Sequence, residues 1–138
     1  MGKSELELFI TKVKKNFEDA VSFCAGKGGK LYEPRNANTM NDVSNQAIAK
    51  GIHRFWLGIH DKNEEGTFVY VSDDSPIEFK NWNNGEPNDY GKGEDCVALY
   101  PHIRKWIDLP CQTDESSIVC VREKQGNCYR VLLTIRAS

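Results

Sequence analysis

Residues 73–93 are the stretch that most limits how this chain can fold. The segment is rich in Asn, Gly, Pro and Asp and shows almost no hydrophobic periodicity, so neither a helix nor a strand is indicated. Irregular segments of this length are uncommon inside compact domains, where they are usually functional or are held by something other than secondary structure. We therefore expect an additional constraint on this part of the chain.

Acidic and amide side chains gather at the end of this segment and in a nearby loop. Glu86-Pro87-Asn88 is followed by Glu94-Asp95 beside Cys96, and then by Trp106-Ile107-Asp108. Ca²⁺ takes about six to eight oxygen ligands, and carboxylates crowded without a counter-ion repel one another. The pattern predicts a calcium ion that holds the loops, with part of its coordination shell open to ligand hydroxyls. The alternative interpretation is a solvated acidic surface.

The cysteines indicate an oxidising compartment. Five are present, none in the paired C-x-x-C spacing of a metal site, and their surroundings are polar and rich in loops. We therefore expect disulfides and an extracellular, secreted protein. At 138 residues the chain is one domain by size. A net charge of -2 with scattered Lys and Arg predicts no nucleic-acid partner, and no apolar run is long enough for a membrane span.

Two early helices followed by short strands are expected. Asn16 is placed to cap a first helix, whose apolar stripe runs from Phe17 to Cys24 and which ends at the glycines from Gly26 onward. A second helix is expected over about Asn38–Lys50. Strands are expected at Leu6–Lys14, Phe55–Ile59, Thr67–Val71, Cys96–Tyr100 and Ser117–Val121. This order indicates an α+β domain with short antiparallel sheets.

The sequence does not favour an enzyme. No nucleophile is paired with a general base. The histidines have no ligand spacing, and we expect them at the surface or at strand edges: His53, His60 and His102. The tryptophans are expected to lie in the core or to anchor loops: Trp56, Trp82 and Trp106.

Several motifs, in order along the chain, resemble those of the C-type lectin domains, and among them the mannose-binding collectin type. The resemblance covers residues 7–123 and rests on Phe55-Trp56-Leu57-Gly58-Ile59, Asn81-Trp82, Glu86-Pro87-Asn88, Gly93-Glu94-Asp95-Cys96, Trp106-Ile107-Asp108 with Cys111, and Cys120. It implies the C-type lectin fold: two helices, a long calcium-stabilised loop region and the disulfides Cys24–Cys120 and Cys96–Cys111. Residues 1–6 are then an added start or an N-terminal extension, and residues 124–138 a tail of unknown role.

The resemblance assigns a principal Ca²⁺ site to Glu86, Asn88, Glu94 and Asp108. In the family, neighbouring sugar hydroxyls bind this ion directly, and the same carboxylates and amides accept and donate hydrogen bonds to them. The Glu-Pro-Asn order implies sugars with equatorial 3- and 4-hydroxyls, of the mannose, glucose, GlcNAc or fucose type. Tyr90 stands where relatives place a side chain against the sugar ring. The peptide bond before Pro87 is expected to be cis.

A second, structural Ca²⁺ site is implied for Asp61, Glu65, Asp89, Glu94 and Asp95. The chain departs from the family at Ile107, where relatives usually have an Asn that supplies a calcium oxygen and an N–H donor to the sugar. Isoleucine supplies neither group, so weaker calcium and sugar binding or an altered preference is expected.

The implied function is a calcium-dependent lectin for mannose-type glycans, in innate recognition of glycans. Single sites of this kind bind weakly, so several sites in a homo-oligomer are expected. Cys128 has no partner in the implied pairing and either joins two chains or stays a free thiol. The alternative function is a C-type-lectin-like module that binds a protein or another non-sugar ligand, with sugar binding weakened or lost through Ile107.

Overall fold

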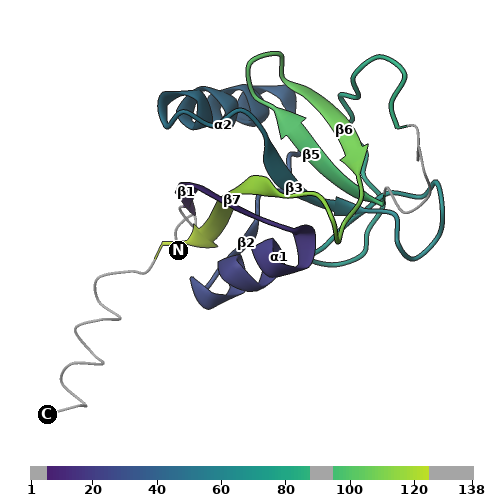
Figure 1. Ribbon diagram of the computed structural model, residues 1–138, viewed down its shortest axis with the longest axis horizontal. Helices are drawn as coiled ribbons and strands as arrows, with labels where there is room; N and C mark the ends of the chain where they lie inside the picture. The colour runs from purple at the N-terminus through teal and green to yellow at the C-terminus, as the bar shows by residue number, and fades with distance from the viewer. Residues whose placement is uncertain (1–5, 88–94, 125–138) are drawn as a thin grey trace, which may run out of the picture.

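The computed structural model describes residues 6–87 and 95–124 (Figure 1). In chain order its elements are β1 (Leu6–Lys15), α1 (Phe17–Gly26), β2 (Lys30–Leu31), α2 (Ala37–Ala49), β3 (Phe55–His60), β4 (Val69–Tyr70), β5 (Cys96–Tyr100), β6 (Lys105–Leu109) and β7 (Ser116–Glu123). The α+β expectation is confirmed, because both helices precede the run of strands from β3 to β7.

One mixed sheet carries the domain. Its strands lie in the order β1-β7-β3-β5-β6, with β2 also paired to β7 and β4 to β3. All neighbours are antiparallel except β3 and β7, which are parallel at one residue pair, Phe55 and Ser117. The expected antiparallel arrangement is therefore right for every pairing but this one. Figure 1 shows the two helices on opposite sides of the sheet.

Alternate residues of the strands supply two hydrophobic clusters, one on each face. Neighbouring side chains of a strand point to opposite faces, so Phe55 and Leu57 face α2 while Trp56 faces α1. The cluster on the α2 side contains Met40, Val43, Ala47, Phe55, Leu57, Val97, Leu99, Trp106, Val119 and Val121. The cluster on the α1 side contains Phe17, Ala20, Cys24, Trp56, Cys96, Ala98, Ile107, Leu109, Ile118 and Cys120. Burial of each large side chain contributes about 1.5–3 kcal/mol.

Both helices begin at an asparagine. The Asn16 side chain accepts a hydrogen bond from the Asp19 N–H at 2.9 Å, as the sequence predicts. Asn36 does the same for α2 by accepting from the Thr39 N–H, so this helix begins slightly before the predicted residue. Gly29 follows α1 because the chain passes β7 closely: a Cβ there would lie 2.3 Å from the Val121 carbonyl oxygen.

The two predicted disulfides are present. Cys24–Cys120 joins α1 to β7, and Cys96–Cys111 joins the start of β5 to the residues after β6. In the chain-entropy model, cross-links separated by 96 and 15 residues stabilise the fold by about 4–5 and about 3 kcal/mol. The fifth cysteine, Cys128, lies outside the described residues.

The strand β6 was missed by the sequence analysis. Trp106-Ile107-Asp108, expected in a loop, lies inside this strand and pairs with β5 through partners such as Val97 and Asp108. The segment is only five residues long, and Asp108 interrupts its apolar residues. His60 is also not at the surface: it ends β3 and is only 8% exposed. The tryptophans lie where predicted, with Trp56 and Trp106 fully buried.

The long irregular segment is fixed along the outer edge of β6. The Trp106 N–H donates to the Asn81 carbonyl at 3.0 Å, and the Asn83 N–H donates to the Trp106 carbonyl at 2.8 Å. The Trp82 ring contacts the Trp106 ring, with centroids 5.5 Å apart. These contacts satisfy backbone groups at a sheet edge that would otherwise be unpaired.

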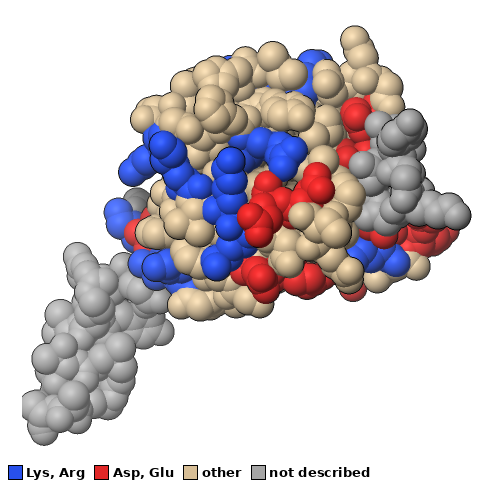
Figure 2. All heavy atoms as spheres, viewed as in Figure 1, with Lys and Arg blue, Asp and Glu red and all other residues tan. Residues whose placement is uncertain are grey.

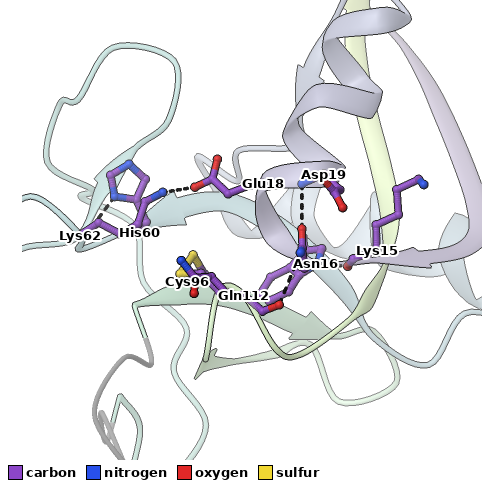
Figure 3. Close-up of a disulfide and its surroundings, with 10 residues drawn as sticks. Lys15, Asn16, Glu18, Asp19, His60, Lys62, Cys96 and Gln112 are labelled. Carbon is purple, nitrogen blue, oxygen red and sulfur yellow. Dashed lines mark hydrogen bonds and ion pairs between the residues drawn. A yellow bond between two sulfur atoms is a disulfide. The ribbon is translucent and has the colours of Figure 1, made fainter.

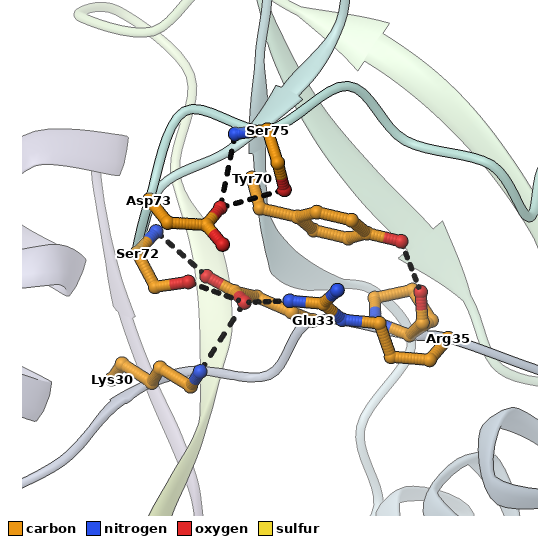
Figure 4. A network of polar contacts seen from close by, with 8 residues as sticks. Lys30, Glu33, Arg35, Tyr70, Ser72, Asp73 and Ser75 are labelled. Carbon is orange, nitrogen blue, oxygen red and sulfur yellow. Dashed lines mark hydrogen bonds and ion pairs between the residues drawn. The ribbon is translucent and has the colours of Figure 1, made fainter.

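A buried carboxylate holds the start of the same segment (Figure 4). The Glu33 side chain, 2% exposed, accepts hydrogen bonds from the Ser72 N–H and hydroxyl, both at 2.9 Å. Lys30 and Arg35 form ion pairs with it at 3.3 and 3.1 Å, and the Arg35 guanidinium lies 3.7 Å from the Tyr70 ring centroid. Glu33 thereby joins the turn after β4 to the chain before α2.

Replacing Glu33 by Ala should lower the free energy of unfolding by about 2 kcal/mol, because the Ser72 N–H and hydroxyl lose the buried carboxylate that accepts their hydrogen bonds. Chemical denaturation would measure the loss. Glu115→Ala, which removes an exposed carboxylate after β6, serves as the control. Equal stabilities of the two variants would contradict the assigned role of Glu33.

Candidate metal centre

Asp61, Glu65 and Asp95 form a carboxylate cluster at one end of the sheet. One oxygen from each of the three lies within 4.8 Å of the others. Sheet pairing explains the proximity: His60 pairs with Cys96, so Asp61 and Asp95 are the next residues beyond the paired strands. The Asp61 N–H donates to the Asp95 carbonyl at 2.9 Å. The structure thus brings together three of the five residues predicted for the second calcium site.

A tight turn returns Glu65 to the cluster. The Gly66 N–H donates to the Asp61 Oδ2 atom at 2.8 Å and closes the turn between them. Gly66 has a φ of 88°, which glycine adopts without the steric cost that other residues pay. The sequence therefore folds locally so that Glu65 faces Asp61.

The cluster is electrostatically unbalanced without a cation. Asp61 is 2% exposed, and its buried Oδ1 atom has no hydrogen-bond partner. Burial raises the pKa of the Asp61 carboxyl to about 6; the Gly66 N–H opposes this shift and the Asp95 carboxyl adds to it. A hard dication would compensate the clustered carboxylates, and oxygen donors of this kind suit Ca²⁺.

A second acidic pair lies beside β6. The Asp108 N–H donates to the Glu86 Oε1 atom at 3.4 Å, and Asp108 is 3% exposed. Glu86 belongs to the segment fixed along the edge of β6, and Asp108 belongs to β6 itself. This edge of the sheet therefore positions both residues. The Glu86–Pro87 peptide bond is cis, as predicted.

The structure therefore brings together two residues of the predicted principal site. The remaining predicted ligands and sugar contacts lie outside the described residues: Asn88, Asp89, Tyr90 and Glu94.

Ile107 packs into the hydrophobic cluster on the α1 side and is 7% exposed. Its β-sheet partner is Ala98, and Leu109 of the same strand belongs to the same cluster. Its side chain has no atom able to ligate a metal ion.

Two residues that the sequence analysis did not assign to the site support the carboxylate cluster (Figure 3). The Lys62 N–H donates to the His60 Nδ1 atom at 3.1 Å, and the Lys62 ammonium forms an ion pair with Glu18 on α1. Burial, followed by the Lys62 charge, holds the pKa of His60 below its usual value. The apolar run Phe55–Ile59 marks β3 in the sequence, but the burial of His60 at its end depends on the packing of the whole strand.

Comparison with known families gives a match over most of the chain. The model of the family described as Lectin C-type domain matches residues 13–122. Collectin-11 of Danio rerio is 36% identical over 103 residues, which are 75% of this chain and 38% of that protein. Pulmonary surfactant-associated protein D of Bos taurus is 35% identical over 107 residues, which are 78% and 28% of the two chains. The chain thus spans less than two-fifths of the length of these two relatives.

Solved structures confirm the predicted C-type lectin fold. The mouse scavenger receptor C-type lectin carbohydrate-recognition domain has a TM-score of 0.80 and 26% identity, with 91% of this chain and 95% of that chain covered. The carbohydrate-recognition domain of cow CD23, solved in the presence of GlcNAc2Man3 oligosaccharide, has a TM-score of 0.77 and 27% identity, with 88% and 90% covered. In the part of the chain that is described, no helix has the length and apolar character to cross a membrane.

The raised pKa of Asp61 predicts how the calcium-free domain responds to pH. The folded state binds this proton more tightly than the unfolded state, whose pKa is near 3.8, so stability is lost as pH rises through about 6. The difference in free energy of unfolding between Asp61→Asn and the wild type should therefore shift by about 2 kcal/mol in favour of the variant as the pH rises from 4 to 7. Urea denaturation in EDTA would measure the difference, and a difference independent of pH would refute the assignment.

Proposed function

Because this chain belongs to the family of C-type lectin domains, we propose that it binds carbohydrate through a calcium ion that contacts the sugar directly. The family consists of non-enzymatic lectins, in agreement with the absence of a nucleophile–base pair in the sequence. The protein would therefore act by binding its ligand without converting it, and the ion would form part of the ligand-binding surface.

The observation that carries the calcium assignment is the cluster of Asp61, Glu65 and Asp95. Three carboxylates within 4.8 Å, one with a buried oxygen that accepts no hydrogen bond, favour binding of a dication. Asp89 and Glu94 would complete this shell. Its ion would be structural, because it would join the residues after β3 to those before β5 and so order the intervening loop.

The principal, sugar-binding ion would lie beside the outer edge of β6. The contact between Glu86 and Asp108 supports this position, because it brings the Glu86 carboxylate to the backbone of Asp108, which is distant in sequence. Asn88 and Glu94 would supply the remaining protein ligands. Together the four residues offer three negative charges and one neutral amide, which leaves coordination positions for uncharged sugar hydroxyls.

We assign the sugar to the mannose class from the order Glu86-Pro87-Asn88. A carboxylate that accepts and an amide that donates would select hydroxyls with a complementary arrangement. Mannose, glucose, GlcNAc and fucose present such hydroxyls. Tyr90 would contact the ring face of the bound sugar.

A single site of this kind would bind weakly, since a monosaccharide buries little surface. Several sites in one assembly would raise the avidity, which supports a homo-oligomer. The two disulfides support an extracellular location, where such bonds persist. The biological setting we propose is innate recognition of glycans.

A second candidate function follows from Ile107, whose side chain has no calcium-ligating atom and which is 7% exposed. If the shell of the principal ion stays incomplete, the loops would bind a protein or another non-sugar ligand. Retention on mannose-agarose in calcium, with elution by EDTA, supports the lectin. Failure to be retained, while calcium binding is measurable by calorimetry, supports the second function.

Replacing Glu86 or Asp108 by Ala should abolish calcium-dependent binding to mannose, because each variant removes a carboxylate ligand of the ion. The disulfide-linked fold should persist, as measured by circular dichroism. Glu115→Ala, which removes an exposed carboxylate after β6, is the matched control and should retain binding. Wild-type affinity in either site variant would contradict the site.

Replacing Ile107 by Asn should tighten calcium binding roughly fivefold by adding an amide oxygen, equivalent to about 1 kcal/mol. The same change should cost about 2 kcal/mol of calcium-free stability, since an amide enters an apolar cluster. Calcium titration and thermal unfolding would measure the two effects. Ile107→Val controls for lost packing and should leave calcium affinity unchanged; no gain with Asn would place residue 107 away from the ion.

A further inference from the structure

An apolar groove of about 550 Å³ lies between β1 and α2. Its apolar lining consists of Leu6 and Leu8 of β1, Val121 of β7, Val43 of α2, and Tyr32, which follows β2. Its rim is polar and includes Lys30, Glu33, Arg35, Asp42 and Gln46.

The groove exists because α2 covers only part of its face of the sheet. The α2 residues Met40, Val43 and Ala47 pack in the cluster built on β3 and β5. The helix does not cover the β1 side of this face, so Leu8 is only partly buried and Leu6 is 64% exposed. Apolar side chains grouped beside such a hollow indicate a surface that another segment covers.

The sequence after β7 contains a segment with the pattern of a strand. Between residues 129 and 135, every second residue is large and apolar: Tyr129, Val131, Leu133 and Ile135. Arg130, Leu132 and Thr134 alternate with them. A period of two places the four apolar side chains on one face of an extended chain.

The connection between the groove and this segment is short. Val121, which lines the groove, precedes Tyr129 by eight residues, and Gln125-Gly126-Asn127 between them is a turn-forming sequence. Residues 129–135 would span about 20 Å when extended. A tether this short gives a high effective concentration, which favours this segment over an unlinked partner.

The charges at the rim also suit this occupant. Lys30 and Arg35 are already paired with Glu33. Asp42 is exposed and forms no ion pair within residues 6–87 and 95–124. The neighbouring segment carries Arg130 and Arg136, whose positive charges are complementary to the negative charge of Asp42.

We propose that residues 129–136 lie as an extended strand in the groove between β1 and α2, with Tyr129, Val131, Leu133 and Ile135 against its apolar lining. The segment would cover Leu6 and Leu8 and close the open side of the α2 cluster. This assignment is independent of calcium and of the sugar.

A spin label on the segment tests its position. In the full chain, Cys128→Ser with Leu132→Cys places one nitroxide on the face of the segment opposite the four apolar residues. Amide signals of residues 42–46 on α2 should be at least twofold weaker than in the same labelled chain carrying Val131→Ser, Leu133→Ser and Ile135→Ser. Equal intensities in the two chains would overturn the proposal. So would broadening in ¹⁵N-labelled chains mixed with separately spin-labelled ones, because the occupant would then be a second copy.

A double-mutant cycle in the full chain gives an independent readout. Leu6→Ser should lower Tm by about 4 °C with the natural segment and should have little effect when Val131, Leu133 and Ile135 are serine. Ile103→Ser, at an apolar residue of similar exposure between β5 and β6, should cost the same in both backgrounds. An equal cost of Leu6→Ser in both backgrounds would exclude contact between Leu6 and the segment.

Discussion

The pairing of β3 with β5 is the constraint on which the rest of this structure depends. It sets His60 opposite Cys96, so the carboxylates of Asp61 and Asp95 emerge together where the sheet ends. Backbone hydrogen bonds between the strands hold these two carboxylates close together although like charges repel each other. The stability of the sheet therefore maintains an arrangement that favours a cation. Binding of a cation would relieve the repulsion between the carboxylates and so stabilise the fold.

Disulfides and polar contacts stabilise different parts of the chain. Disulfides join regular elements, α1 to β7 and the start of β5 to the end of β6. The irregular segment is fixed by polar contacts at its start, through Glu33 at Ser72, and near its middle, through Trp106 at Asn81 and Asn83. Covalent links thus fix the regular elements, whereas the irregular segment depends on weaker interactions, among which we place the calcium ions.

Much of this architecture could be predicted because it follows from local rules. The Asn16 cap, the apolar face of α2 and the buried run of β3 each have a period or residue type that indicates the element. The strand β6 could not be predicted in this way, since its five residues, with Asp108 in the fourth position, show no clear period and pairing with β5 decides their conformation. The burial of His60 likewise depends on neighbours distant in sequence.

The place where the chain enters and leaves the sheet has a mechanical consequence. Leu6 and Glu123 are paired neighbours, so a force applied through both ends would separate β1 from β7 one hydrogen bond at a time rather than all together. Extension would then stop at Cys24, because its bond to Cys120 carries the load directly between the two ends. Everything between these cysteines, including the acidic loops, would stay unloaded while a tethered domain is pulled.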